Sequence, residues 1–267
     1  MNDSHHPTTF VEARGTRFAV TDEGEGPVVI NAHGLTGSRR SGRDLGVVDF
    51  SPLVTAGRRL VSYDARGHGE TRGAADPAAY GWDELGLDLL ALSGVLSPTA
   101  PVSAIGASMG TGSLLHAVTT DPGRFDRLVL TTSPTAWEGR AAQADGYRQM
   151  AGLVESRDPA LVRQVFARAA VPEIFTGIEG FPPSPDVSFD LLPAVFRGAA
   201  STDLPSRDAV ARIEQPTLIL GWPGDGAHPI ATSEELARLI PGSTLHVSET
   251  LEDVRSWGHL IASFLAA

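Results

Sequence analysis

The stretch Gly106-Ala107-Ser108-Met109-Gly110 decides the fold of this chain. It follows an apolar run at 101–105, which we expect to be a strand, and it precedes a predicted helix at 111–120. A glycine on each side of the central serine lets the backbone turn sharply from strand to helix without side-chain clashes. Such a turn lifts the serine hydroxyl out of the sheet and points it at a cleft. The pattern therefore predicts that Ser108 is a nucleophile.

The composition narrows the class of protein. The chain has 267 residues, is 42% hydrophobic, carries a formal net charge of -11 and contains no cysteine. This length fits one α/β domain with an insertion. The negative charge argues against a nucleic acid or an anionic membrane as partner, since both need clustered Lys and Arg. The lack of cysteine excludes disulfides, thiolate catalysis and cysteine metal sites.

The N-terminal residues predict the location of the protein. The first seven residues are polar and lack the apolar core of a signal peptide. No stretch approaches the roughly 18 apolar residues that a membrane helix needs. We therefore expect a cytoplasmic protein without a membrane partner.

Apolar runs that alternate with helical patterns predict the fold class. We expect strands at 9–21 (a strand pair), 27–32, 59–63, 101–105, 125–130, 216–220 and 244–248, and helices at 50–57, 82–96, 111–120, 232–240 and 251–265. Strands that alternate with helices imply right-handed crossovers and a mostly parallel, doubly wound sheet.

A long interruption, residues 133–212, contains no clear strand. Helical patterns occupy 141–155, 158–170 and 191–200, so we interpret 133–212 as a helical lid inserted into a core domain made of 1–132 and 213–267. We expect most of the lid's aromatic residues to form its own small core. Two or three of them facing the cleft would suffice for an apolar pocket. The aromatic residues are Trp137, Tyr147, Phe166, Phe175, Phe181, Phe189 and Phe196.

Four segments, in the correct order along the chain, resemble the α/β-hydrolase superfamily. They are His33-Gly34 after an early strand, Asp64-x-Arg66-Gly67-His68-Gly69 after the next, the serine turn, and Gly221-x-x-x-Asp225-x-x-x-Pro229 near the end. The resemblance runs from about residue 9 to the C-terminus. It implies an α/β-hydrolase fold with a helical lid, in the branch of esterases and lactonases that use a serine nucleophile.

The resemblance also implies roles for individual residues. Ser108 would attack an acyl carbon, and Asp225 would be the acid that orients the catalytic imidazole. The oxyanion of the tetrahedral intermediate needs hydrogen-bond donors already in place. The family supplies one from the amide after the nucleophile, here Met109, and another from the loop after the early strand, here Leu35.

The histidine base is missing from its usual place. In the family it follows the last strand, but residues 249–253 of this chain hold no histidine. His228, three residues after Asp225, is one candidate, because a base and its orienting acid on one loop are geometrically feasible. His246, within the last strand, is the alternative base, although its position favours burial under a helix. His259 lies inside the closing helix and is expected to be too far along it to reach the cleft. If no histidine serves, Ser108 lacks a proton acceptor.

These residues predict a cofactor-independent and metal-independent serine hydrolase of the carboxylesterase type. Its substrate would be a small or medium apolar ester, thioester or lactone, and cleavage of a carbon–carbon bond in a diketone stays open. The displaced histidine keeps two alternatives. One is a non-hydrolytic cyclase, lyase or acyltransferase, and the other is a small-molecule binding module on a hydrolase scaffold. Neither the substrate nor the oligomeric state follows from the sequence.

Overall fold

A computed structural model describes residues 7–156, 158–167 and 171–267. Within these residues eight strands form one sheet in the order β1-β2-β4-β3-β5-β6-β7-β8. The pairs β1–β2 and β2–β4 are antiparallel, and the five remaining pairs are parallel. The strands are β1 (Thr9–Ala13), β2 (Thr16–Glu23), β3 (Val28–Ala32), β4 (Arg59–Tyr63), β5 (Val102–Ala107), β6 (Phe125–Thr131), β7 (Thr217–Gly221) and β8 (Thr244–Val247).

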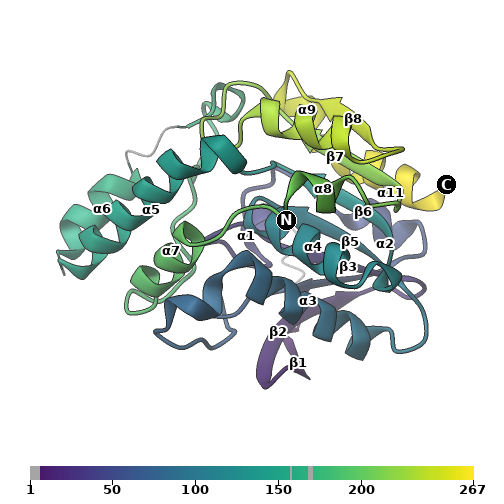
Figure 1. Cartoon of the computed structure of the whole chain (residues 1–267), viewed down its shortest axis with the longest axis horizontal. Coiled ribbons are helices and arrows are strands. Elements are labelled where there is room, and N and C mark those ends of the chain that lie inside the picture. The colour runs from purple at the N-terminus through teal and green to yellow at the C-terminus, as the bar shows by residue number, and fades with distance from the viewer. Residues whose placement is uncertain (1–6, 157, 168–170) are drawn as a thin grey trace.

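The helices lie on both faces of this sheet (Figure 1). The α-helices are α1 (Ser41–Asp44), α2 (Ser51–Thr55), α3 (Trp82–Leu96), α4 (Met109–Thr120), α5 (Arg140–Glu155), α6 (Pro159–Ala167), α7 (Leu192–Ala200), α8 (Arg207–Val210), α9 (Ile230–Leu239), α10 (Leu251–Arg255) and α11 (Trp257–Ala266). The 3-10 turns are η1 (Pro77–Tyr80), η2 (Pro122–Arg124), η3 (Trp137–Gly139) and η4 (Glu173–Phe175). The doubly wound, mostly parallel sheet predicted from the sequence is therefore confirmed.

Two apolar clusters form the core, one on each face of the sheet. On the first face, α3, α4, α8 and α9 pack through residues such as Leu89, Leu114 and Leu236. On the second face, α2, α10 and α11 pack through Leu53, Val254 and similar side chains. The central strands read as nearly continuous apolar runs because they are buried on both faces. The carboxyl ends of the parallel strands are where such a sheet places a ligand site.

The insertion between β6 and β7 is helical in its described part. It contains α5, α6, α7 and α8 together with η3 and η4. Figure 1 shows α5, α6 and α7 grouped at one end of the molecule, away from the C-terminus. Phe196 stacks with both Tyr147 and Phe166 in the cluster that these three helices share. Part of the predicted helix at 158–170 lies outside the described residues.

The closing segment differs from the prediction of one helix at 251–265. It forms two helices, because α10 ends at Arg255 and α11 begins at Trp257. The amide of Ser256, between them, donates to the carbonyls of Glu252 and Asp253 and completes the last turn of α10. Among the described residues, no helix combines the length and apolar character needed to cross a bilayer.

Candidate active site

The turn between β5 and α4 holds Ser108 in a strained conformation. Ser108 has φ +52° and ψ -109°, a region that residues other than glycine rarely adopt. Its amide donates to the carbonyl of Thr131 on β6 at 3.1 Å, which fixes the turn against the sheet. Strain of this kind persists only where the surrounding structure enforces it, and it collects at functional sites.

The two flanking glycines are required by close backbone contacts. A Cβ on Gly106 would lie 2.5 Å from the carbonyl oxygen of Gly110. A Cβ on Gly110 would lie 2.2 Å from the carbonyl oxygen of Ala32 on β3. These approaches bring α4 directly against the end of the sheet, so that the helix starts beside Ser108.

We expect Gly110→Ala to lower the free energy of unfolding by about 3 kcal/mol, because backbone atoms must move to admit the methyl group. Urea denaturation at neutral pH measures this change. Gly94→Ala on α3 is a matched control, since its Cβ would meet no atom within 4 Å. That control should be neutral or stabilising by up to about 1 kcal/mol, as alanine favours a helix. Equal stability of the two variants would contradict the steric account of the turn.

The loop after β7 folds back on itself around the carboxylate of Asp225. Oδ1 of Asp225 accepts hydrogen bonds from the amides of Ala227 at 2.9 Å and His228 at 3.2 Å. The carbonyl of Ala227 accepts from the amide of Thr135, at the start of the insertion. This compact turn brings the His228 ring next to the carboxylate three residues earlier in the chain.

Ser108, His228 and Asp225 form a continuous hydrogen-bonded chain. Nδ1 of His228 lies 2.9 Å from Oδ2 of Asp225, and Nε2 lies 2.9 Å from Oγ of Ser108. The carboxylate can only accept, so Nδ1 carries the proton and Nε2 is left to accept the proton of Ser108. The structure thus brings together the predicted nucleophile, acid and first candidate base.

The carboxylate of Asp225 is suited to orient the ring. Its side chain is 10% exposed and that of His228 is 26% exposed. Burial alone would raise the pKa of Asp225, but the hydrogen bond and charge of His228, with the two loop amides, hold that pKa below its ordinary value. Asp225 is therefore ionised at neutral pH and can stabilise an imidazolium.

The other two candidate bases, His246 and His259, lie away from Ser108. His246 pairs with Leu220 in the sheet register, and β8 is separated from β5 by β6 and β7. Three strand spacings amount to roughly 14 Å, far beyond hydrogen-bond reach. Nε2 of His246 is buried without a partner among the described residues. His259 is exposed on α11. His246 is half-buried rather than buried under a helix as expected, and neither ring is placed as a base.

The backbone beside Ser108 offers two amides without protein partners. In the described part of the chain, neither the Leu35 amide nor the Met109 amide donates a hydrogen bond to the protein. A Cβ on Gly34 would lie 3.4 Å from Cβ of Ser108, so this loop runs directly past the serine. The Gly34 carbonyl accepts from Nδ1 of His33 at 2.8 Å and from the Gly37 amide at 3.1 Å. The Gly34 carbonyl and the Leu35 N–H belong to one trans peptide, in which the C=O and N–H bonds point in opposite directions. The Leu35 N–H therefore points away from these two donors.

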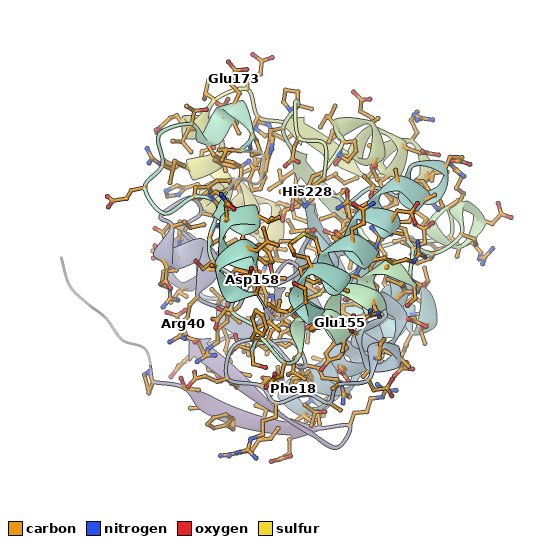
Figure 2. All side chains as sticks on the ribbon, turned by 90° about the vertical axis from the view of Figure 1, so that its left-hand side faces the viewer. Phe18, Arg40, Glu155, Asp158, Glu173 and His228 are labelled. Atoms are coloured by element: carbon orange, nitrogen blue, oxygen red, sulfur yellow. The ribbon has the colours of Figure 1, made fainter. Side chains whose placement is uncertain are left out.

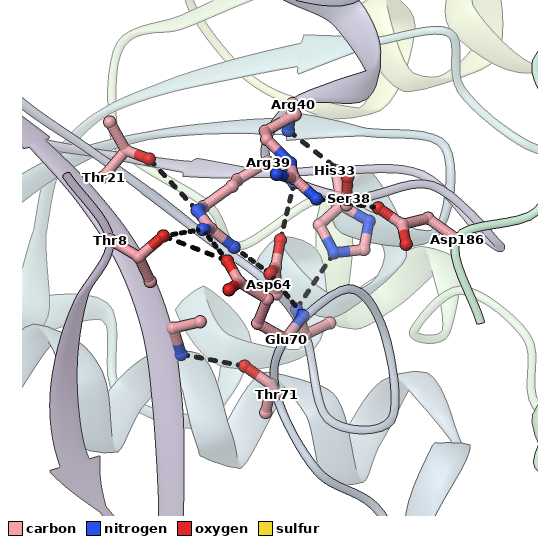
Figure 3. Close-up of polar contacts among 12 residues, drawn as sticks. Thr8, Thr21, His33, Ser38, Arg39, Arg40, Asp64, Glu70, Thr71 and Asp186 are labelled. Atoms are coloured by element: carbon pink, nitrogen blue, oxygen red, sulfur yellow. Dashed lines mark hydrogen bonds and ion pairs between the residues drawn. The ribbon is translucent and has the colours of Figure 1, made fainter. Parts of the chain in front are cut away.

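A buried cluster of charged groups around Arg39 anchors this loop (Figure 3). The Arg39 guanidinium bonds to the carboxylates of Asp64 and Glu70, and its Nε donates to Thr21 Oγ1 at 3.1 Å. The Arg39 amide donates to Asp64 Oδ1 at 2.8 Å. The Arg39 side chain is 2% exposed and that of Asp64 is fully buried. The Asp64-to-Gly69 motif therefore serves as the anchor for the loop that carries Leu35.

The insertion also contacts this loop. The Asp186 amide donates to the Thr36 carbonyl, and the Asp186 carbonyl accepts from the Gly69 amide, each at 2.7 Å. The Leu35 side chain packs against the apolar cluster of α5, α6 and α7. Figure 2 turns this side of the molecule to the viewer, and His228 lies above Glu155 and Asp158 in this view. The helical insertion thus adjoins the loop beside Ser108.

Two buried histidines under this loop make stability sensitive to acid. Nε2 of His33 accepts from the Ala65 amide at 2.9 Å, and the His68 ring lies 5.2 Å from the His33 ring. Burial lowers the pKa of His33 to about 4 and that of His68 to about 3. Both pKa values lie below the unfolded value, so stability is fully present above about pH 6.5 and is lost as the pH falls below it.

When the pH falls from 7 to 4.5, each of these histidines becomes protonated in the unfolded state but remains largely neutral in the folded state. We expect this difference to lower the free energy of unfolding by about 2 kcal/mol per histidine. Urea denaturation at the two pH values measures the loss. His68→Leu removes one titrating group, so its loss should be smaller than that of the wild type by about 2 kcal/mol. An identical pH dependence in both proteins would show that His68 does not titrate in this range.

A cavity of about 950 Å³ opens beside the serine turn. Gly34, Leu35 and Ala107 line one end of it, and Trp222 forms part of its wall. This cavity was not predicted from the sequence, which led us to expect a pocket between the core and the lid aromatics. Of the insertion, only Phe181, Pro183 and Ser184 are among its lining residues. The segment that covers the cavity contains glycines at 37, 42 and 46. These small residues were the available sign in the sequence that a cavity could form there.

Comparisons with known proteins agree with this architecture. A family model for the alpha/beta hydrolase fold matches residues 27–172. No curated protein matches the sequence closely enough to count as a relative. A hydrolase from Pseudomonas aeruginosa PA01 has a similar solved structure, with a TM-score of 0.80 and 25% identity over 99% of this chain and 100% of its own.

Two further solved structures share the fold at lower identity. The esterase EaEST from Exiguobacterium antarcticum has a TM-score of 0.75 and 21% identity, covering 98% of this chain and 100% of its own. The enol-lactonase from Burkholderia xenovorans LB400 has a TM-score of 0.67 and 21% identity, covering 97% of this chain and 100% of its own. In the described part of this chain, no three acidic or histidine side chains gather as a metal site would require.

Proposed function

Because the chain belongs to the α/β-hydrolase family, we propose that it is a serine hydrolase acting on a small or medium apolar ester, thioester or lactone. One observation carries the proposal: Ser108 Oγ, the His228 ring and Asp225 are joined by two hydrogen bonds of 2.9 Å. A serine becomes nucleophilic when a neighbouring base takes its proton. His228 meets that need, although it follows β7 rather than β8.

The reaction would proceed through an acyl-enzyme. Ser108 Oγ attacks the acyl carbon while Nε2 of His228 takes the hydroxyl proton, and Asp225 stabilises the imidazolium. The amides of Leu35 and Met109 would hold the oxyanion. When the tetrahedral intermediate collapses, His228 gives its proton to the departing oxygen or sulfur. Water, deprotonated by His228, then attacks the ester on Ser108, and the proton returns to Oγ as the acid leaves.

Acyl transfer to Ser108 explains the hydrogen-bonded base better than the two alternative functions do. A binding module or a reaction that uses only the oxyanion hole would not need a base bonded to the serine. An esterase and an enol-lactonase occur among the similar solved structures, which is consistent with acyl chemistry on this fold. The net charge of -11 favours an uncharged small molecule over nucleic acid as partner.

Hydrolysis of p-nitrophenyl acetate tests the proposed function. We expect turnover by the wild type and a loss of at least about a thousandfold in Ser108→Ala. Circular dichroism would confirm that the variant is folded. Turnover that survives in Ser108→Ala, or a wild type that hydrolyses no short ester or thioester, would reject the proposal.

A further inference from the structure

The cavity beside the serine turn lies on one face of the sheet. Its floor consists of side chains that point to the face of α2 and α11, among them Leu60 and Ile105. Its roof is the segment 36–50, which joins β3 to the helix α2. We call it the roofed cavity. It starts at Gly34 and Ala107, next to Ser108, and reaches Asp22 to Gly24 at the end of β2.

The roofed cavity exists because the segment between β3 and β4 is poor in helix. A sheet face is normally covered by a packed helix. Here α1 has four residues and α2 has five. Leu45, Val48 and Phe50 of this segment pack around the cavity, and Phe181, Trp222 and Trp257 close its other side. These side chains give the cavity an apolar wall, while Arg39, Ser41 and Thr132 are among its polar lining residues.

The floor carries one polar pair. Nδ2 of Asn31 donates to Oγ of Ser62 at 3.2 Å, and the two residues are neighbours on β3 and β4. Ser62 is 4% exposed. Among the described residues, the Asn31 side chain has no other hydrogen bond, so its amide retains an unused oxygen. An amide in an apolar cavity needs a partner.

The position of His228 decides which part of a substrate enters the roofed cavity. His228 must protonate the leaving group, so the leaving group lies on the side of His228. The roofed cavity begins at Gly34, Leu35 and Ala107 and extends from β5 toward β2, away from β7 and the following loop that carries His228. The part of the ester that fits there is the acyl chain.

The path over the floor of the roofed cavity limits the length of the acyl chain that it can hold. The floor crosses β5, β3, β4 and β2, which are neighbours in that order. Three strand spacings across the sheet amount to roughly 14 Å, and the four residues of register between Ala107 and the level of Glu23 add roughly 13 Å along the strands. An extended hydrocarbon advances ~1.3 Å per carbon, so about fifteen carbons fit along this diagonal of about 19 Å. At the far end, Glu23 and Arg43 form an ion pair of 2.7 Å at a partly exposed rim, which disfavours longer apolar chains.

The register gives the depth of the polar pair. Asn31 pairs with Ile105, two residues before Ala107 on β5. Two residues along the strand span roughly 7 Å and the step from β5 to β3 adds roughly 5 Å, so Asn31 lies about 8 Å, or about six carbons, from the acyl carbon. Building on the proposed hydrolase function, we infer that the substrate is an ester of an apolar acyl chain, of about eight to fifteen carbons, with a keto or hydroxyl group near the sixth carbon.

Two variants, one in the roofed cavity and one on the surface, test whether the acyl chain binds in the cavity. Val48→Phe narrows the roofed cavity, and Val95→Phe adds the same ring on α3, where Val95 is 51% exposed. In the wild type, kcat/KM should rise at least about tenfold from p-nitrophenyl acetate to p-nitrophenyl octanoate, since each buried methylene contributes. Val48→Phe should lower kcat/KM for the octanoate about tenfold more than kcat/KM for the acetate. Val95→Phe should change neither.

The polar pair is tested by Asn31→Leu, which keeps the volume and removes the amide. We expect kcat/KM for p-nitrophenyl 6-oxooctanoate to fall about tenfold relative to kcat/KM for p-nitrophenyl octanoate. Equal changes on both esters would overturn the assignment of Asn31. A preference of the wild type for acetate, or equal losses on both chain lengths in Val48→Phe, would overturn the acyl chain assignment.

A binding measurement makes the outcome independent of turnover. In the Ser108→Ala background, calorimetry with methyl octanoate should give a Kd that Val48→Phe raises at least about fivefold and Val95→Phe leaves unchanged. Absence of binding, or no effect of Val48→Phe, would overturn the inference even if acetate is hydrolysed. Binding without any ester turnover would instead reject the proposed function and leave the roofed cavity as the ligand site.

Discussion

Replacing His228 with alanine is expected to lower kcat for p-nitrophenyl acetate by at least about a thousandfold. The reason is that Nε2 of His228 is the atom placed 2.9 Å from Oγ of Ser108. Without it, the serine proton has no acceptor, and the leaving group has no acid. Rates are measured at neutral pH for the purified variant against the wild type.

His246→Ala is the matched control for this prediction. Both residues were candidate bases, but His246 lies on β8 and pairs with Leu220. Its removal should change kcat by less than about threefold, as expected for a group that touches no reacting atom. A large loss in His246→Ala with normal activity in His228→Ala, both variants being folded, would reverse the assignment of the base.

Arg39→Met should lower the free energy of unfolding by about 3–5 kcal/mol. The Asp64 carboxylate is fully buried against the Arg39 guanidinium. Methionine keeps the apolar stem but leaves this carboxylate uncompensated in the interior. Denaturation in urea at pH 7 measures the loss, and the activity should fall as well because Arg39 anchors the loop of Leu35.

Two further variants test the cause of that loss. Glu70→Gln removes the other carboxylate, whose side chain is 43% exposed, and should cost less than about 1 kcal/mol. The double variant Arg39→Met/Asp64→Leu should recover part of the stability, since no buried charge is left unpaired. A double variant that is less stable than Arg39→Met would contradict the buried-charge explanation.

The fold was predictable because its signals are local. The helix predicted at 82–96 coincides with α3, and the serine turn has the positive φ of a strand-to-helix turn. Alternating elements with continuous apolar strands suffice to predict a parallel sheet. The break in the closing segment was missed, since residues on both sides of Ser256 favour a helix.

The site was predictable only in part. Ser108 and Asp225 could be placed by their spacing from strand ends, but the base depended on a loop conformation. The amides of Ala227 and His228 bind Oδ1 of Asp225 and thereby turn the ring toward the other oxygen. Spacing alone does not reveal such a turn, so His228 and His246 both stayed open.

The roofed cavity was not predicted, and the glycines at 37, 42 and 46 are only a weak trace of it in the sequence. Its existence depends on which side chains of 36–50 fail to fill the space over Asn31 and Ser62. Packing of this kind is a property of the tertiary structure and leaves little trace in composition. The lid interpretation of 133–212 stays a prediction, and the contacts of Asp186 with Thr36 and Gly69 are the structural feature that favours it.

We propose that His228 activates Ser108. Labelling with a fluorophosphonate, followed by intact mass and peptide mapping, tests it most directly, because the reagent reacts with an activated serine and needs no matching substrate. We predict one adduct, on Ser108, at equal rates in the wild type and His246→Ala and at least about a hundredfold slower in His228→Ala. A wild type that gives no adduct on Ser108, or equal rates in the wild type and His228→Ala, would contradict the account.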